Sequence, residues 1–320
     1  MDHILNPDEI PANAPNSCPG PLSESAGMLA GCSGCPNQKI CKSGELKPDS
    51  SPEDVKSCLA NVKNKILVLS GKGGVGKSTV TAQIARTLAE SNFSVGALDV
   101  DICGPSLARI MGVNGQTVHK SSSGWSPVYT LDDIAIMSID FLLSSEEDAV
   151  IWRGAKKNGM IKEFLCSVDW GELDFLIIDT PPGTSDEHLA IVSLFKQSKV
   201  NGAILVTTPQ EVSLSDVRKE INFCKKLKIP IIGLVENMSS YTCSKCNVTS
   251  SIFPATSGGA KALADAENIE FLCSLPLDPN IGKNGDNGLS DLSQMPYCST
   301  NKAENMTISN KIVEYCKVSD

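Results

Sequence analysis

The chain has 320 residues, of which 41% are hydrophobic and 20% are charged, a composition that excludes a largely disordered or fibrous protein. Its net charge of −9 gives no positive field toward phosphodiester backbones or anionic lipids, so we expect neither nucleic acid nor a membrane as a partner. The first ten residues, MDHILNPDEI, lack the positive charge and apolar run of a secretory signal, and no stretch has the length that spans a bilayer. We therefore expect a soluble intracellular protein.

Residues 1–57 differ in composition from the rest of the chain. They are rich in Pro, Ser, Gly and Asn, show little hydrophobic periodicity, and hold four of the 13 cysteines. Such a segment cannot build a core unaided, and it becomes ordered when a bound group supplies the folding free energy. The sequence therefore predicts an N-terminal extension over residues 1–57 and one large folded domain over residues 58–320.

The extension contains a four-cysteine motif with the spacing C-x13-C-x2-C-x5-C, formed by Cys18, Cys32, Cys35 and Cys41. Thiols of an intracellular protein stay reduced, so short cysteine spacings indicate metal binding rather than disulfides. Four thiolates complete one tetrahedral zinc site or hold one iron-sulfur cluster. The spacing does not choose between these, and zinc is the default for a four-cysteine module.

The rest of the chain alternates between short apolar runs rich in β-branched residues and segments with helical spacing. This alternation predicts an α/β domain with a mostly parallel sheet, helices on both faces, and ligands at the carboxyl ends of the strands. We expect a polar loop over residues 282–294 and a closing helix over residues 310–315. The expected strands are 66–69, 95–100, 134–141, 175–178, 203–207 and 231–235, and the expected helices are 78–89, 160–166, 213–227 and 259–266.

A complete P-loop pattern, GKGGVGKST, follows the first predicted strand and opens the first predicted helix. Its glycines let backbone N–H groups turn toward phosphates, Lys77 neutralises the terminal phosphates, and the Ser78 hydroxyl is a ligand for Mg²⁺. The pattern in this context predicts a nucleotide site. The residues expected to hold the nucleotide here are Gly71, Gly73, Gly74, Val75, Gly76, Lys77, Ser78 and Thr79.

Polar residues also follow three of the later strands. Carboxylates at Asp99, Asp101 and Asp179 can orient Mg²⁺ and the attacking water, and the glycine of the Asp179–Thr184 stretch (DTPPGT) lets the backbone move when the γ-phosphate is lost. An amide at Asn237 can pair with the edge of a base, although a plain turn asparagine is a fair alternative.

A second cysteine motif, Cys243-Ser244-Lys245-Cys246, lies shortly after Asn237. Two ligands cannot complete a tetrahedral site, so this motif favours a cluster shared between two subunits, with a redox dithiol as the alternative. The other cysteines stand singly and receive no role. They are Cys58, Cys103, Cys166, Cys224, Cys273, Cys298 and Cys316.

The lysine at position 72, directly after the first glycine of the P-loop, makes the sequence resemble the deviant Walker A P-loop ATPases, which are of the SIMIBI type. In that family the equivalent lysine reaches across a dimer to the nucleotide of the other subunit, whereas the simpler alternative is a loop lysine that assists its own nucleotide. The match is closest to the Mrp/nucleotide-binding-protein ATPases of iron-sulfur cluster assembly, in their long form with N-terminal cysteines. The stretches that carry it include DVDICGPS (99–106), VIWRG (150–154), DTPPGTSDEHL (179–189), VTTPQ (206–210) and TSGGA (256–260).

This resemblance implies a set of roles for the residues above. Lys72 and Lys77 would contact the phosphates, Asp101 of switch I would orient the water, Asp179 would be the Walker B carboxylate, and Asn237 would contact adenine, which favours ATP. A firmly held [4Fe-4S] cluster would lie on the N-terminal cysteines. A more labile one would be bridged between subunits by Cys243 and Cys246.

The implied function is a cytosolic ATPase scaffold that assembles [4Fe-4S] clusters for cytosolic and nuclear apoproteins. It would act as a homodimer, or as a hetero-oligomer (tetramer) with a shorter paralogous ATPase, together with later cluster-targeting factors. Three alternatives remain open: a zinc-stabilised ATPase chaperone, a spatial organiser of membranes or filaments, and an electron-donating reductase.

Overall fold

The computed structural model describes residues 27–29, 32–33, 35, 38–43, 51–121, 124–143, 152, 154–184, 186–287 and 299–319. The chain divides into two compact units, residues 1–53 and residues 54–320. In the first unit, the described residues include helix α1 (Gln38–Ser43). The predicted boundary after residue 57 falls inside helix α2 (Ser51–Cys58), which leads into the first strand.

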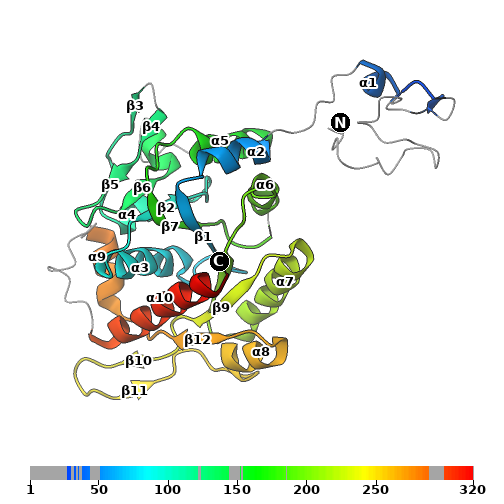
Figure 1. Ribbon diagram of the computed structural model, residues 1–320. Coiled ribbons are helices and arrows are strands. Elements are labelled where there is room, and N and C mark those ends of the chain that lie inside the picture. The colour runs from blue at the N-terminus through cyan, green and yellow to red at the C-terminus, as the bar shows by residue number, and fades with distance from the viewer. Residues whose placement is uncertain are drawn as a thin grey trace. The chain divides into compact units, whose positions relative to one another are not determined.

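The second unit is built on one eight-stranded sheet with the order β12-β9-β8-β1-β7-β2-β6-β5 (Figure 1). All neighbouring pairs are parallel except β5 and β6, which confirms the predicted α/β class with a mostly parallel sheet. The strands are β1 (Val62–Leu69), β2 (Val95–Asp99), β5 (Val128–Tyr129), β6 (Ala135–Met137), β7 (Leu173–Asp179), β8 (Gly202–Thr207), β9 (Ile231–Glu236) and β12 (Phe271–Ser274).

Helices cover both faces of the sheet. Along the sheet, the connection from β1 to β2 through α3 runs in one direction, and the later connections from β6 to β12 run in the opposite direction. Because crossovers between parallel strands are right-handed, α3 lies on one face of the sheet, and α5, α6, α7 and α8 lie on the other. Helix α10 packs against α3. The helices of this unit are α3 (Lys77–Glu90), α4 (Leu107–Ile110), α5 (Gly154–Cys166), α6 (Asp186–Leu194), α7 (Glu211–Leu227), α8 (Gly259–Glu267), α9 (Pro279–Asn287) and α10 (Ser299–Ser319).

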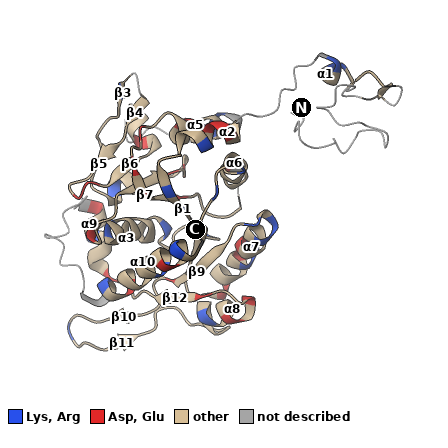
Figure 2. Ribbon diagram, viewed as in Figure 1, with Lys and Arg blue, Asp and Glu red and all other residues tan. Residues whose placement is uncertain are grey.

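Burial on both faces explains the apolar runs in the sequence. Every residue of β2 and β8 is buried, and seven of the eight residues of β1 are buried. The surface helices are amphipathic instead, and acidic and basic side chains are interspersed along α7 and α8 (Figure 2). No helix among the described residues is long and apolar enough to cross a membrane.

Three predicted elements need correction. The strand expected over 134–141 ends at Met137, because the Ser138 hydroxyl accepts the N–H of Asp140 and starts a 3-10 helix over Ile139–Leu142. The loop expected from residue 282 is helical as far as Asn287 in α9, which begins at Pro279 after Asp278, whose carboxylate accepts the N–H of Asn280 at 2.9 Å. Residues 288–294 lie outside the described residues.

The closing helix, expected over 310–315, begins at Ser299 and is part of the core. Its buried face mixes apolar and polar residues, because Asn301, Asn305 and Ser309 are as buried as Ile308 and Ile312. Because of this mixture, the segment lacks the apolar periodicity that predicts a helix from sequence.

The burial of α10 predicts how substitutions along it act. Replacing Ile308, which is fully buried, with Ala should lower the free energy of unfolding by about 2–4 kcal/mol through lost burial and a cavity. Val318 lies on the same helix with 88% of its surface exposed, and Val318→Ala should change stability by less than about 0.5 kcal/mol. Urea unfolding of both variants measures the difference, and equal effects would contradict this packing.

Candidate nucleotide site

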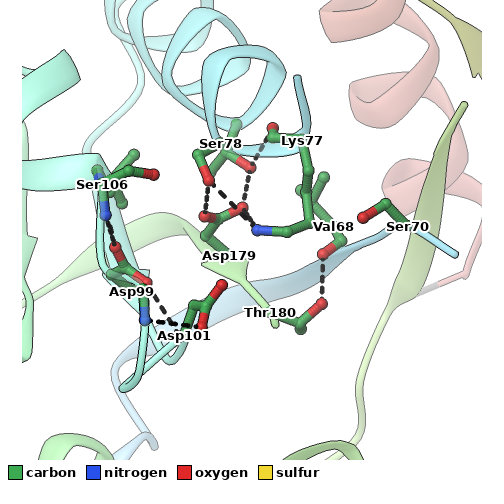
Figure 3. A network of polar contacts seen from close by, with 12 residues as sticks. Val68, Ser70, Lys77, Ser78, Asp99, Asp101, Ser106, Asp179 and Thr180 are labelled. Atoms are coloured by element: carbon green, nitrogen blue, oxygen red, sulfur yellow. Dashed lines mark hydrogen bonds and ion pairs between the residues drawn. The ribbon is translucent and has the colours of Figure 1, made fainter. Parts of the chain in front are cut away.

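A cavity of about 340 Å³ lies where β1, β2 and β7 end side by side. The register pairs Val68 with Asp179 and Asp99 with Asp179, so the carboxylates that follow separate strands meet at one edge of the sheet (Figure 3). The P-loop lines most of the cavity, with Asp101 and Ser106 from the loop after β2 and Pro182 from the loop after β7. The structure thus brings together most of the residues that the sequence assigned to phosphate, magnesium and water.

Asp179 is the centre of the polar network in this cavity. Its carboxylate is fully buried and lies 2.7 Å from the Lys77 ammonium. It also accepts a hydrogen bond from Ser78 Oγ at 2.5 Å (Figure 3). A second hydroxyl, Thr81 Oγ1, donates to it at 2.7 Å. A buried ion pair persists only when further hydrogen bonds satisfy both charges, and the two hydroxyls supply them to the carboxylate. The Lys77 ammonium is therefore paired with Asp179 and lines the cavity in which phosphates are expected to bind.

The loop after β2 is held by Asp99. Its carboxylate accepts backbone N–H groups from Asp101 at 3.0 Å and from Ser106 and Leu107 at 3.1 Å each, so it fixes the loop and starts α4. Burial, and then the charge of Asp179, raise the pKa of Asp99 to about 8. Asp101 lines the cavity, and burial raises its pKa although Lys77 opposes the shift. A carboxyl of raised pKa facing the cavity suits a group that orients water and accepts a proton.

Two glycines of the P-loop are required by neighbouring segments. Gly76 has φ +86° and faces the amide of Asn237, which donates a hydrogen bond to Val75 O at 2.9 Å. A side chain at Gly71 would bring its Cβ within 2.6 Å of the Asp216 Cβ, so glycine allows α7 to approach the loop. Asn237 thus braces the P-loop from behind, and its predicted contact with adenine stays a prediction.

Lys72 points toward α7 of its own chain. Its ammonium lies 3.1 Å from Asp216 Oδ2, with 42% of the lysine side chain exposed. Asp216 also pairs with Lys219 at 2.8 Å, and hydrogen bonds from Lys219 and then Lys72 lower the pKa of Asp216. Lys72 is therefore paired with a carboxylate of its own chain.

The loop after β7 is tied to the base of the P-loop and to the helix that follows. Gly183 donates its N–H to Ser70 O at 2.8 Å, and the Thr180 hydroxyl donates to Val68 O at 2.8 Å. His188 of α6 contacts that hydroxyl at 3.2 Å, and burial lowers the pKa of His188 to about 4. A neutral, buried histidine of this kind has a structural role.

The C-x-x-C motif forms the tip of a two-stranded hairpin of β10 (Tyr241–Thr242) and β11 (Thr249–Ser250). The Cys243 N–H bonds to Val248 O at 3.0 Å and closes the turn. Hydrogen bonds from the Cys246 and Lys245 N–H groups, and then from the Cys246 side chain, lower the pKa of the Cys243 thiol. Cys246 is exposed. The turn therefore favours the thiolate form that binds metals.

The N-terminal cysteines are described in part. Cys32 and Cys35 lie on one turn, in which the Cys35 N–H donates to Cys32 O at 3.1 Å, and Cys41 lies on α1. Cys18 lies outside the described residues. Within the described part of the chain, no group of three or more His, Cys, Asp or Glu side chains is arranged to hold a metal ion. The predicted four-cysteine site stays a prediction.

The fold and the P-loop site together define a P-loop NTPase with a mostly parallel sheet. Residues 61–313 match the family model ParA, described as the NUBPL iron-transfer P-loop NTPase. Because this match covers most of the chain, the protein belongs to the NUBPL iron-transfer P-loop NTPase family.

Solved structures agree with this assignment. The chain is 38% identical to a nucleotide-binding protein from Archaeoglobus fulgidus in complex with ADP, with a TM-score of 0.66 over 78% of this chain and 98% of that chain. The cell division ATPase MinD from Pyrococcus furiosus is 23% identical with a TM-score of 0.58, covering 79% of this chain and 99% of that chain. MinD from Pyrococcus horikoshii, complexed with Mg-ADP, is 21% identical with a TM-score of 0.55, covering 80% and 98%. The two MinD structures show the shared fold.

The sequence alone did not indicate two residues of the site, Thr81 and Asp216, or the structural role of a third, Asp99. Thr81 follows the P-loop pattern by two positions, and its contact with Asp179 depends on the pitch of α3. Asp99 was noted, but its capping of the loop to Leu107 needs the register of β2 against β7. Asp216 is far from the P-loop in sequence and gives no local signal. Gly71 leaves room for Asp216, but the P-loop pattern already requires a glycine at this position, so Gly71 does not by itself indicate that α7 lies close by.

Glu220 lies one turn after Asp216 on α7 and predicts a pH dependence. It is 1% exposed, and its Oε2 has no hydrogen-bond partner among the described residues. Burial, and then the charge of Asp216, raise its pKa from 4.5 to about 7. A carboxyl whose pKa is higher in the folded state favours folding below the unfolded pKa, and this contribution is lost as the pH rises through 7.

Glu220→Gln should remove this loss. The free energy of unfolding of the variant, relative to the wild type, should increase by about 2 kcal/mol between pH of about 5 and pH of about 8.5. Urea titrations of nucleotide-free protein at both pH values measure the change. A pH-independent effect of Glu220→Gln would contradict the raised pKa.

Proposed function

We propose that this protein is an ATP-dependent scaffold that assembles [4Fe-4S] clusters and transfers them to apoproteins of the cytosol and nucleus. The proposal is carried by two features found together in a chain of the iron-transfer family: a complete P-loop site, and a C-x-x-C turn at the tip of a hairpin where Cys246 is exposed. A spatial organiser would have no use for such a turn. The cluster is the cargo of this activity, and ATP is its substrate.

The site residues support the nucleotide chemistry. Ser78 Oγ and the Asp179 carboxylate are 2.5 Å apart and offer the hard oxygen ligands that suit Mg²⁺, which when bound would neutralise charge on the transferred phosphoryl group. In our proposal, arrival of the phosphates draws Lys77 from Asp179 to the terminal phosphates. Asp101 orients the attacking water from the facing side of the cavity.

We propose that two subunits face each other across the nucleotide, as a homodimer or within a hetero-oligomer with a shorter paralogue. Lys72 then exchanges Asp216 for the phosphates bound by the other subunit. The exchange is small in energy, because the lysine is 42% exposed and an exposed ion pair is worth at most about 1 kcal/mol. The γ-phosphate attracts the lysine more strongly than Asp216 does, and its presence decides which partner Lys72 contacts.

This exchange predicts opposite effects for the two members of the pair. Lys72→Ala should prevent nucleotide-dependent dimerisation and lower ATP turnover at least tenfold, because a transition-state cation is lost. Asp216→Ala should shift dimerisation to a severalfold lower ATP concentration, because nothing retains the lysine. Light scattering and phosphate release measure the two quantities. Lys63→Ala, at an exposed pair outside the cavity, is the control, and weaker dimerisation of Asp216→Ala would argue against the exchange.

The path from nucleotide to cysteines runs through β9 and the segment after it. Asn237 follows β9, braces Val75 of the P-loop, and lies six residues before Cys243. The segment between them is anchored to the loop after β12, because Ser239 donates its N–H to Leu275 O at 3.0 Å and Leu277 donates to Ser240 O at 2.7 Å. Movement of the P-loop on ATP hydrolysis therefore reaches the cysteine hairpin through a hydrogen-bonded segment.

Metal analysis tests the scaffold function. Anaerobically purified protein should contain iron and acid-labile sulfide in matching amounts. The variant Cys32→Ala/Cys35→Ala and the variant Cys243→Ala/Cys246→Ala should each lose part of both, because they remove ligands of separate clusters. Cys224→Ala, at a buried cysteine of α7, is the control and should retain both. Zinc without sulfide would reject the scaffold and favour a zinc-stabilised ATPase chaperone.

A further inference from the structure

Two cysteines that are distant in the sequence lie side by side in the structure. Cys58 ends α2 and Cys166 ends α5, and their side chains are joined by a thiol hydrogen bond. They are 108 positions apart in the chain, so no spacing rule connects them. In the sequence both stand singly, and neither received a role there.

The contact belongs to a regular arrangement of the two helices. Lys162 Nζ of α5 and Asp54 Oδ2 of α2 lie 2.8 Å apart. Cys58 follows Asp54 by four residues and Cys166 follows Lys162 by four, so each cysteine lies one helical turn beyond its charged residue on the same face. The two helices therefore run in the same direction here, and the ion pair holds them in the register that brings the sulfurs together.

The two sulfurs differ in environment. Cys58 is exposed and open to small solutes, whereas Cys166 is partly buried. Burial, and then the hydrogen bond to Cys58, raise the pKa of Cys166 to about 12, so its thiol keeps its proton and donates to the Cys58 sulfur. Because Cys58 is the exposed sulfur, a small solute reaches it before it reaches Cys166.

We propose that Cys58 and Cys166 form a reversible intramolecular disulfide, a redox site separate from the cysteines assigned to iron. The oxidant is a low-molecular-weight disulfide such as oxidised glutathione. The Cys58 thiolate attacks one sulfur of the oxidant, forms a mixed disulfide and releases one thiolate. The Cys166 thiol then loses its proton to that thiolate or to water, attacks the Cys58 sulfur and releases the second thiol. Two protein thiols are oxidised, and one disulfide is reduced to two thiols.

The bond would restrain a helix that touches the nucleotide cycle. Helix α5 packs against α6, and Lys157 of α5 lies 2.6 Å from Glu187 of α6, shortly after the Asp179–Thr184 loop. A covalent link from the end of α2 to the end of α5 would therefore limit how far α5 can follow that loop when the γ-phosphate is lost. The redox state of Cys58 and Cys166 would therefore affect the rate of ATP turnover.

The experiment uses the full-length protein with its bound metal. Native protein is incubated anaerobically with mixtures of reduced and oxidised glutathione, quenched with acid, alkylated and digested, and its cysteine peptides are quantified by mass spectrometry. A peptide joining Cys58 to Cys166 should accumulate with oxidised glutathione and disappear on reduction. In Cys166→Ser, Cys58 should instead carry glutathione at an occupancy at least about fivefold above the wild type. In Cys58→Ser, Cys166 should remain a free thiol.

The proposal is overturned if wild-type Cys58 carries glutathione to the same extent as in Cys166→Ser, or if both wild-type thiols remain free under all mixtures. The linked peptide of the wild type decides the question even if a serine variant fails to fold. Cys103, another exposed cysteine, reports in the same digest how far an exposed thiol outside the pair is modified.

Discussion

The nucleotide site depends on one buried carboxylate. Asp179 ends the central strand β7 and receives Lys77, Ser78 and Thr81 at one point, so the first turn of α3 is fixed against the sheet before any phosphate arrives. A buried carboxylate without these partners would be costly, and the same partners are the groups that phosphate and Mg²⁺ require. In the function that we propose, nucleotide binding rearranges the same interaction that orders these side chains, so the site would act as a switch.

The two lysines of the P-loop, Lys72 and Lys77, differ in burial and in the carboxylates that they contact. Lys77 is buried and bound to a fully buried carboxylate, whereas Lys72 is partly exposed and pairs with a carboxylate shared with Lys219. Removing one member of the first pair would leave an uncompensated buried charge, whereas the second pair is weak enough to be exchanged. In the function that we propose, this difference separates nucleotide binding within one chain from the association of two.

The sheet and the P-loop could be predicted because their signals are local. Continuous apolar runs such as β8 follow from burial on both faces, and Gly71 to Thr79 follow a fixed pattern. Prediction failed where the role of a residue depends on a contact with a residue that is distant in the sequence. Asp216 meets Lys72 only because α7 passes the P-loop, Cys58 meets Cys166 only because α2 and α5 are neighbours, and the buried asparagines of α10 conceal its helix. The ligand set of the N-terminal cysteines lies partly outside the described residues.

The hairpin of Cys243 and Cys246 has only two residues in each strand. An isolated ribbon of this size is at best marginally stable, and most of its order comes from the closing bonds at Cys243 and the anchors at Leu275 and Ser240. In the function that we propose, a cluster bound at Cys243 and Cys246 would restrict the hairpin, and its departure would restore the conformational entropy of the hairpin. An acceptor that recognises the ordered hairpin would thus bind the protein with its cluster more tightly than the protein without it. The bound cluster would then itself favour binding of the acceptor that receives it.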